Sequence, residues 1–213
     1  MKSYKLYLFD LDGTLIDSDQ MLIETFHELY DNFRPGFKPS DEYIRQFSGP
    51  QIAETLKKEF PNESLEKMLN EYRTRSRRFY DIYVKLFPGV LEMFNKMNQK
   101  GIKFAVITNK HRYATDYSYE LLGLEKYNIF SICADDVKNL KPAPDGIYET
   151  MKHFGIKNKD DVIYIGDGTI DYLTAKNAGV NFGYTAWSPR PIAGNPKIDV
   201  NIENFLSFAE EIE

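Results

Sequence analysis

The hydrophobic positions of this chain change period along its length. An unbroken apolar run from Tyr4 to Phe9 predicts a buried strand close to the first residue. From Leu22 onwards, hydrophobic residues recur three or four positions apart and predict a helix that ends near Pro35. No strand pattern is seen between Asp17 and Lys85. A single strand is therefore followed by a helical tract.

Two more helices are predicted within this tract. One opens at Ser48-Gly49-Pro50, because proline suits the first turn of a helix, and it places Ile52 and Leu56 on one face. The other begins after Pro61-Asn62 and runs towards Tyr83. The tract is thus long enough to form a helical domain of its own.

After Phe87, apolar runs of strand length alternate with helical patterns that end at glycine. In chain order these are a strand at 102–107, a helix at 112–122, a strand at 129–133, a helix at 146–154, a strand at 162–165, a helix at 172–178 and a strand at 180–184. This alternation predicts an α/β fold, a Rossmann-like parallel sheet with helices on both faces. We expect an α/β core of residues 1–16 and 86–213, interrupted by a helical domain of residues 17–85.

Two carboxylates follow the first predicted strand. Asp10 and Asp12 stand where the strand ends, and Gly13 lets the backbone turn sharply after them. Open α/β sheets bind ligands at the carboxyl ends of their strands. Two close carboxylates repel each other unless a cation or proton lies between them, so the pair predicts a divalent-metal site. Taken alone, the pair is equally consistent with a turn-capping role.

Further polar residues follow the later strands. Thr108 and Asn109 end the second strand, Lys141 precedes a proline, and Asp167 and Asp171 end the strand at 162–165. Each has a plain structural alternative when it is considered alone. A threonine often caps the next helix, most lysines are solvated, and an aspartate is favourable near a helix N-terminus.

Taken together and in order, these patterns resemble the four motifs of the haloacid dehalogenase-like hydrolase superfamily, in its phosphatase branch and its phosphoglycolate phosphatase group. The motifs are Asp10-Leu11-Asp12-Gly13-Thr14, Thr108-Asn109, Lys141-Pro142 and Gly166-Asp167-Gly168-Thr169-Ile170-Asp171. The match runs from near Lys5 to about Gly179, and Gly168 stands where many relatives carry serine. The resemblance implies that residues 17–85 form a mobile cap that closes over the active site and selects the substrate.

The resemblance also implies roles for the motif residues. Asp10 is the nucleophile that forms an aspartyl-phosphate, and Asp12 is the general acid and then the general base. Thr108 and the amide of Asn109 hydrogen-bond the transferring phosphoryl group, and Lys141 neutralises it together with Asp10.

The implied cofactor is Mg²⁺. Its ligands are the Asp10 carboxylate, the Asp12 backbone carbonyl and Asp167, while Asp171 orients the waters of the metal. In the cap, the position of the segment Ser48-Gly49-Pro50-Gln51 makes Arg45, Ser48 and Gln51 the candidates for substrate contact.

The composition of the chain indicates which partners and which cellular compartment to expect. The 213 residues carry a formal net charge of −5, which disfavours nucleic-acid partners and anionic membranes. Cys133 is the only cysteine and no long apolar stretch is present, so we expect a cytoplasmic protein without an intrachain disulfide. The oligomeric state is left open, and a monomer is compatible with the sequence. A loop is expected at Trp187 to Arg190.

The expected function is a Mg²⁺-dependent phosphatase for a small phosphate ester such as phosphoglycolate, pyrophosphate, a nucleotide or a sugar phosphate. A β-phosphoglucomutase-like phosphotransferase is the enzymatic alternative. It is less favoured because Leu22 and Gln51 hold the places where such enzymes carry a histidine and a basic residue. The non-enzymatic alternative is a phosphometabolite-binding sensor, which could lose Asp10 or Lys141 without penalty, whereas this chain has both.

Overall fold

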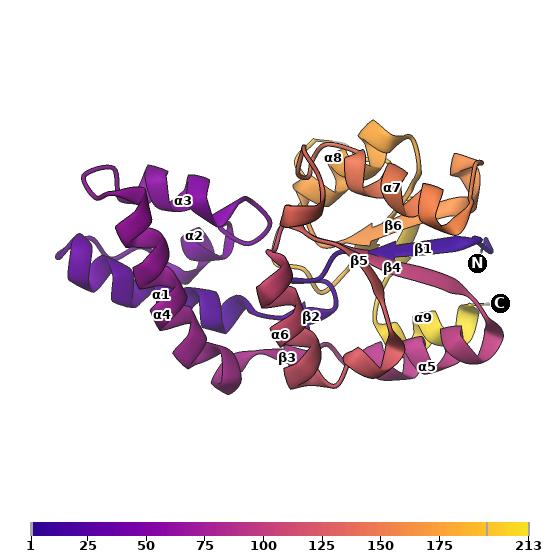
Figure 1. Cartoon of the computed structure of the whole chain (residues 1–213), viewed down its shortest axis with the longest axis horizontal. Coiled ribbons are helices and arrows are strands. Elements are labelled where there is room, and N and C mark those ends of the chain that lie inside the picture. The colour runs from indigo at the N-terminus through magenta and orange to yellow at the C-terminus, as the bar shows by residue number, and fades with distance from the viewer. Residues whose placement is uncertain (1, 195, 213) are drawn as a thin grey trace. The chain divides into compact units, whose positions relative to one another are not determined.

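The computed structural model describes residues 2–194 and 196–212 (Figure 1). The chain divides into two compact units. The helical unit is Ile16–Lys85, and the α/β unit comprises the chain up to Leu15 and from Leu86 onwards. The two chain crossings between the units are marked by short strands, β2 Ile16–Asp17 and β3 Lys85–Leu86, which form a two-stranded sheet of their own.

The α/β unit is built on a six-stranded sheet with the order β5-β4-β1-β6-β7-β8. Strand β1, Leu6–Phe9, lies at the centre and pairs in parallel with β4, Lys103–Ile107, on one side and with β6, Val162–Gly166, on the other. The outer strands are β5 Phe130–Ile132, β7 Asn181–Thr185 and β8 Val200–Ile202, and they extend the sheet in parallel as well. The predicted parallel sheet is therefore confirmed.

Helices cover both faces of this sheet. Figure 1 shows α7 Asp145–Phe154 and α8 Thr169–Ala178 above it, and α5 Val90–Lys100 and α9 Phe205–Glu211 below it. Because both faces are covered, every residue of β1 is fully buried, which is why its sequence is continuously apolar rather than alternating.

The two faces of β1 pack into different surroundings. Leu6 and Leu8 join a cluster with residues of α7 and α8. On the other face, the Phe9 ring contacts Phe94 of α5 and Phe205 of α9 edge-on, with ring centroids 5.9 and 6.1 Å away. The position at which β1 ends is thus fixed from both sides.

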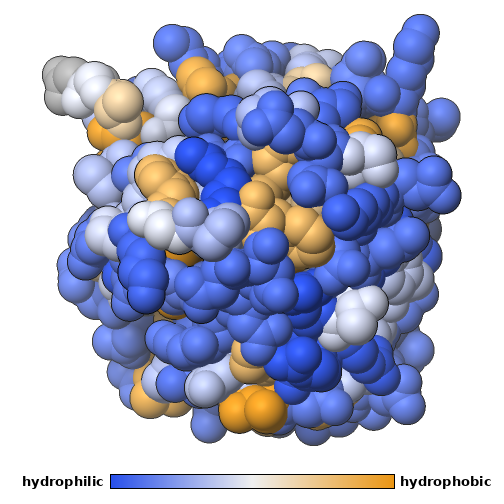
Figure 2. All heavy atoms as spheres, turned by 90° about the vertical axis from the view of Figure 1, so that its left-hand side faces the viewer, coloured by the Kyte–Doolittle hydropathy of each residue, from blue (hydrophilic) through white to orange (hydrophobic). Residues whose placement is uncertain are grey.

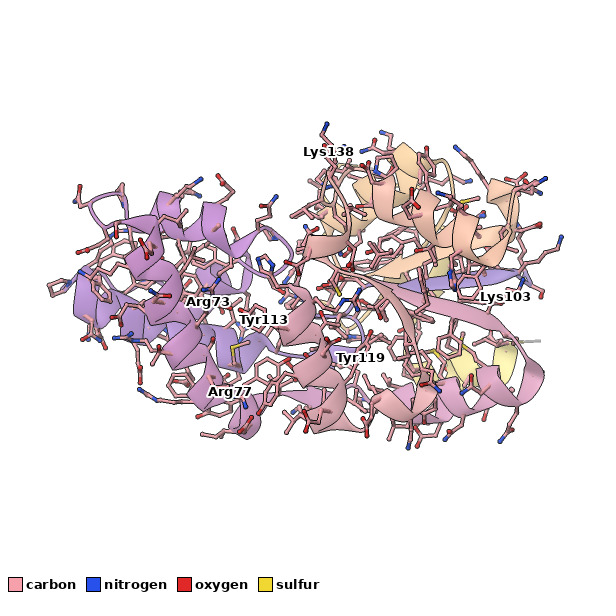
Figure 3. All side chains as sticks on the ribbon, viewed as in Figure 1. Arg73, Arg77, Lys103, Tyr113, Tyr119 and Lys138 are labelled. Carbon is pink, nitrogen blue, oxygen red and sulfur yellow. The ribbon has the colours of Figure 1, made fainter. Side chains whose placement is uncertain are left out.

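The sixth helix, α6 Arg112–Leu122, has the bounds that the sequence predicts. It ends at Gly123, whose φ of 67° is favourable only for glycine. Tyr119, labelled in Figure 3, ties the helix to the sheet edge through a 2.7 Å hydrogen bond between its hydroxyl and that of Ser131 in β5.

Helix α8 begins earlier than predicted. The hydrophobic pattern indicates a start at Tyr172, whereas the helix begins at Thr169. Its first turn carries Asp171, a polar residue that is buried, so a search for apolar periodicity misses this turn. Helices α5 and α9 and strand β8 were not predicted.

The helical unit contains α1 Asp19–Phe33, α2 Asp41–Arg45, α3 Ile52–Glu59 and α4 Leu65–Tyr83. The five-residue α2 was missed because it has too few residues to show a period. Its start is set by the Ser40 hydroxyl, which accepts a hydrogen bond from the Tyr43 N–H.

Figure 2 shows a face of the molecule that is mostly hydrophilic, with small hydrophobic areas. In the part of the chain that the structure describes, no helix is long and apolar enough to span a bilayer.

A carboxylate lies in the interior of the helical unit. Glu59 has a side chain that is only 4% exposed, and it accepts hydrogen bonds from the hydroxyls of Tyr30 at 2.9 Å and Tyr43 at 2.7 Å. Arg34 lies 3.4 Å from the same carboxylate and donates a second bond, of 2.8 Å, to the Glu59 carbonyl. Burial, followed by the hydrogen bond to Glu59, raises the pKa of Tyr30 far above its usual value. The buried charge is thus stabilised from α1 and α2 together.

We expect Glu59→Ala to lower the free energy of unfolding by about 2–3 kcal/mol, because it leaves the Tyr30 hydroxyl buried without its acceptor. Chemical denaturation followed by circular dichroism measures the loss. Glu54→Ala is the matched control in the same helix, since Glu54 is 64% exposed and pairs with Lys57 on the surface, and it should cost less than about 0.5 kcal/mol. Equal losses in the two variants would contradict a special role for Glu59.

Candidate active site

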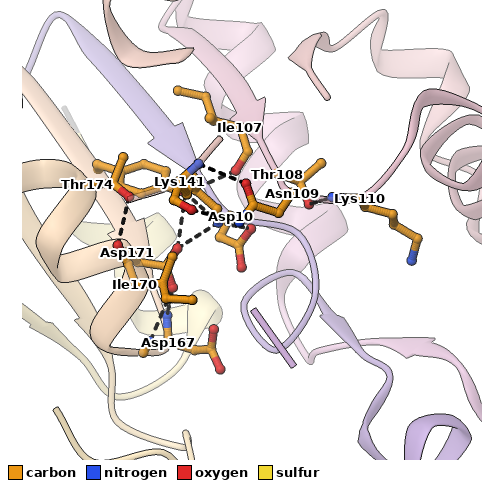
Figure 4. A network of polar contacts seen from close by, with 12 residues as sticks. Asp10, Ile107, Thr108, Asn109, Lys110, Lys141, Asp167, Ile170, Asp171 and Thr174 are labelled. Carbon is orange, nitrogen blue, oxygen red and sulfur yellow. Dashed lines mark hydrogen bonds and ion pairs between the residues drawn. The ribbon is translucent and has the colours of Figure 1, made fainter. Parts of the chain in front are cut away.

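The three central strands of the α/β unit end in polar residues at one edge of the sheet. Asp10 follows β1, Thr108 follows β4 and Asp167 follows β6 (Figure 4). Because these strands are parallel neighbours, residues that are far apart in the sequence meet at this edge. All three are buried, with 3–5% of each residue exposed.

Lys141 lies at the centre of the cluster. Its ammonium group donates to the carboxylates of Asp10 at 2.6 Å and Asp171 at 2.8 Å, and to the hydroxyl of Tyr164 at 3.0 Å. An ammonium group has three protons, so these acceptors satisfy it completely. The side chain is only 4% exposed, which makes this an ion-pair network inside the protein.

The charges of this network shift its pKa values. Burial raises the pKa of Asp10 well above its usual value; the Lys141 ammonium opposes that shift, whereas the carboxylates of Asp171 and Asp167 add to it. Burial also disfavours the charge on Lys141, but Asp10 and Asp171 outweigh that effect and raise the pKa of Lys141 well above its usual value. These surroundings favour the charged form of Lys141, and the three carboxylates around it outnumber it.

Asp171 is held on both of its carboxylate oxygens. Oδ1 accepts from Lys141 and lies 3.2 Å from the Tyr164 hydroxyl, while Oδ2 accepts from the N–H groups of Asp167 and Gly168, both at 3.2 Å. This fixes the loop that carries Asp167. A carboxylate so fully engaged fits an orienting role better than direct metal ligation.

The cluster fits a hard divalent cation. Carboxylate oxygens of Asp10, Asp167 and Asp171 all lie within 4.8 Å of one another. Lys141 binds Oδ1 of Asp10, the carboxylate oxygen that lies 2.6 Å from its ammonium group. Oxygen ligands at this spacing, with excess negative charge, are what Mg²⁺ requires.

Asp12 lies apart from this cluster. Its carboxylate forms an ion pair with Lys110, whose Nζ is 3.1 and 3.2 Å from the two oxygens. The Asp12 side chain is 23% exposed, compared with 5% for Asp10. Lys110 was not among the predicted site residues, although it directly follows Thr108-Asn109 in the sequence.

The side chain of Asn109 has a structural task. Its Oδ1 accepts from the Lys141 N–H at 2.9 Å, and its Nδ2 donates to the Lys141 carbonyl at 3.1 Å. Asn109 therefore fixes the backbone of the lysine loop to the end of β4. The neighbouring Thr108 hydroxyl accepts from the Lys110 N–H at 3.1 Å, which shapes the same turn. The expected binding of a phosphoryl group by Thr108 and the amide of Asn109 stays a prediction.

Tyr164 is a member of the network that the sequence did not reveal. Its hydroxyl contacts Lys141 at 3.0 Å and the carbonyl oxygen of Ile107 at 3.0 Å. It lies within β6, in an apolar run, where a tyrosine looks like any other core residue. Only the position of its hydroxyl in the folded chain distinguishes it.

Arg190 is a second cation of the site. Its Nη1 lies 2.5 Å from Oδ2 of Asp167, and its side chain is 11% exposed. Gly13 borders this pair with a φ of 83°, and a Cβ at Gly13 would lie only 2.4 Å from the same Asp167 oxygen. The glycine after Asp12 is therefore required both for its turn and for the space it leaves to Asp167.

The three residues predicted to contact substrate belong to the helical unit. Arg45 is the last residue of α2, with its Nε 3.8 Å from a carboxylate oxygen of Asp19. Ser48 is half-buried, and Gln51 is exposed immediately before α3. Their role in substrate contact stays a prediction.

Comparison with known proteins shows the family to which the chain belongs. The sequence profile of the haloacid dehalogenase-like hydrolases matches residues 7–184, which include the whole helical unit and the three strands that carry the site. The chain therefore belongs to this family and is a hydrolase of the class that its motifs resemble.

Several individual proteins are similar to this chain over most of its length. A protein named pyrophosphatase PpaX from Halalkalibacterium halodurans is 32% identical over 183 residues, 86% of this chain and 84% of the relative. A protein of the same name from Bacillus pumilus is 31% identical over 85% of this chain and 82% of the relative. Among solved structures, that of a predicted phosphoglycolate phosphatase from Haemophilus somnus has a TM-score of 0.80 at 21% identity and covers 99% of this chain and 98% of that one. This last likeness shows the same fold.

We expect Lys141→Met to lower the free energy of unfolding in EDTA by about 3 kcal/mol, because it leaves the buried carboxylates of Asp10 and Asp171 without their cation. Denaturant unfolding of the purified variant measures this loss. Lys152→Met is the control, since Lys152 is 79% exposed and pairs with Glu149 at the surface, and it should change stability by less than about 0.5 kcal/mol. A Lys141 variant as stable as the control would show that the network does not hold the site together.

Proposed function

We propose that this protein is a Mg²⁺-dependent phosphatase that cleaves a small phosphorylated metabolite through an aspartyl-phosphate on Asp10. The observation that carries the proposal is the state of the Asp10 carboxylate. Lys141 holds Oδ1 at 2.6 Å, which fixes the carboxylate and leaves Oδ2 to attack a phosphorus atom. Membership of the hydrolase family supports the same chemistry.

The first step is attack by Asp10 on the phosphoryl group. A phosphate ester is already negative, so a carboxylate nucleophile can approach only if countercharge is present. Lys141 supplies one positive charge beside Asp10. Mg²⁺, held by the Asp10 and Asp167 carboxylates and the Asp12 carbonyl, would supply the rest. Thr108 and the amide of Asn109 are proposed to bind the phosphoryl oxygens.

The second step is hydrolysis of the acyl phosphate. In the proposal, Asp12 first gives a proton to the leaving group and then takes one from the attacking water. Its partial exposure and its location outside the buried network suit a residue that must exchange protons twice. Lys110 then has the task of positioning the Asp12 carboxylate, at 3.1 Å in this structure.

Pyrophosphate is the first substrate to test, because the two relatives at 31% and 32% identity are named pyrophosphatases. Phosphoglycolate, nucleotides and sugar phosphates are the next substrates to test.

We further propose that the helical unit is the substrate-selecting cap and that Arg45, Ser48 and Gln51 contact the substrate from it. The proposed setting is the cytoplasm, where Cys133, a free and buried thiol, stays reduced.

Removal of the metal tests whether the activity depends on Mg²⁺. Phosphate release should fall at least about 100-fold in EDTA and return with Mg²⁺, because the nucleophile then regains its missing countercharge. A colorimetric phosphate assay over a panel of pyrophosphate, phosphoglycolate, nucleoside monophosphates and sugar phosphates measures both metal dependence and preference. Full activity in EDTA would exclude the proposed mechanism.

Two substitutions separate the roles of the carboxylates. Asp10→Asn should lower kcat by about 10³-fold or more and give no phosphoenzyme, because an amide cannot form an acyl phosphate. Asp12→Ala should still form it from a substrate with a good leaving group but hydrolyse it slowly, so that it accumulates. Asp31→Asn, at an exposed position of α1, is the control and should match the unmodified protein.

Intact-protein mass spectrometry after acid quench detects the phosphoenzyme as one added phosphoryl group, which hydroxylamine should remove. Finding that group in Asp10→Asn, or finding it resistant to hydroxylamine in the unmodified protein, would move the nucleophile to another residue.

A further inference from the structure

The loop that follows β7 is attached to the proposed metal site at three points. The Trp187 indole N–H donates to the Gly13 carbonyl at 3.3 Å, and the Ser188 hydroxyl donates to the Asp167 carbonyl at 2.6 Å. The third attachment is the ion pair between Arg190 and Asp167, in which Nη1 lies 2.5 Å from Oδ2. Only this third contact joins opposite charges.

The charge of Arg190 is permanent. A guanidinium group does not lose its proton in proteins, so Arg190 keeps its positive charge wherever the protein is folded. The two side chains are 11% and 6% exposed, and water therefore screens the pair poorly. A divalent cation that approaches Asp167 meets a fixed positive charge already bound there.

Arg190 occupies Oδ2 of Asp167, and the backbone of Gly13 lies against the same oxygen. A Cβ built on Gly13 would lie 2.4 Å from Oδ2 of Asp167 and 3.0 Å from Nη1 of Arg190, which shows how closely the backbone encloses the pair. Two cations on one carboxylate oxygen repel each other, so a metal that bound Oδ2 would have to displace the guanidinium.

We propose that Arg190 is a resident counter-cation that competes with Mg²⁺ for Asp167 and thereby sets the metal concentration at which the site fills. The proposal rests on the metal-binding role of Asp167 proposed above. Arg190 pairs with Asp167 as Lys141 pairs with Asp10. On metal binding the arginine side chain swings away, while Trp187 and Ser188 keep the loop attached through backbone carbonyls.

Removal of the charge should strengthen metal binding. Arg190→Met and Arg190→Gln, made in the full chain and stripped of metal, should bind Mg²⁺ at least about fivefold more tightly than the unmodified protein. Arg190→Lys keeps the charge and should stay within about twofold of the unmodified protein. Isothermal titration with MgCl₂ in the absence of substrate measures the Kd, and the fluorescence of Trp187, the single tryptophan, follows the same titration.

Two controls define the site of the effect. Arg78→Met removes a surface arginine of α4, which pairs with Glu28 at 2.6 Å, and should leave the Kd unchanged. Asp167→Asn should abolish tight binding, both alone and combined with Arg190→Met. Tight binding that survives Asp167→Asn would place the measured metal elsewhere and overturn the proposal.

Two further outcomes would also overturn it. Weaker or unchanged Mg²⁺ binding in both neutral variants would mean that Arg190 does not compete with the metal. A lysine variant that binds as tightly as the methionine variant would mean that the charge is not the cause. Because the titration contains no substrate, a shifted Kd in a protein without phosphatase activity would leave this proposal standing and reject only the proposed function.

Discussion

The ion pair between Lys141 and the carboxylates of Asp10 and Asp171 is the interaction on which the site depends. It joins the end of β1, the loop before α7 and the first turn of α8. The pair costs desolvation energy that good geometry alone can offset, and here every proton of the ammonium group has an acceptor. Once Lys141 is fixed, the positions of both carboxylates are fixed as well. These contacts hold the charged groups of the site in fixed positions, which is the condition for electrostatic catalysis.

Much of this arrangement follows from the sequence. A parallel sheet places the ends of its strands at one edge, so the positions of Asp10, Thr108 and Asp167 directly after apolar runs predict that they meet. The helix ends were predictable where a glycine stops the helix, as at Gly123. The order of the strands was not, because periodicity shows that a segment is a strand but gives no information about its neighbours.

The parts that the sequence did not reveal are polar groups whose partners lie far away along the chain. Tyr164 lies in an apolar strand, and its hydroxyl matters only because Lys141 and Ile107 lie beside it. Arg190 lies in an irregular loop, where nothing local points to Asp167. Short elements such as α2 were missed for a different reason, since five residues are fewer than two helical turns. Local patterns therefore predicted the residues at strand ends, and tertiary contacts determined the residues that support them.

The central place of β1 has a consequence for the order in which the protein forms during translation. Residues 6–9 are synthesised well before their two neighbours in the sheet, β4 and β6, the latter ending at Gly166. Strand β1 must therefore wait for β4 and β6 to be synthesised before its hydrogen bonds within the sheet can form. The helical unit is compact within Ile16–Lys85, so it can fold during this interval. A nascent chain paused before β6 is thus expected to expose β1 to chaperones or to aggregation, and a slow codon placed there would affect yield more than one placed after the sheet is complete.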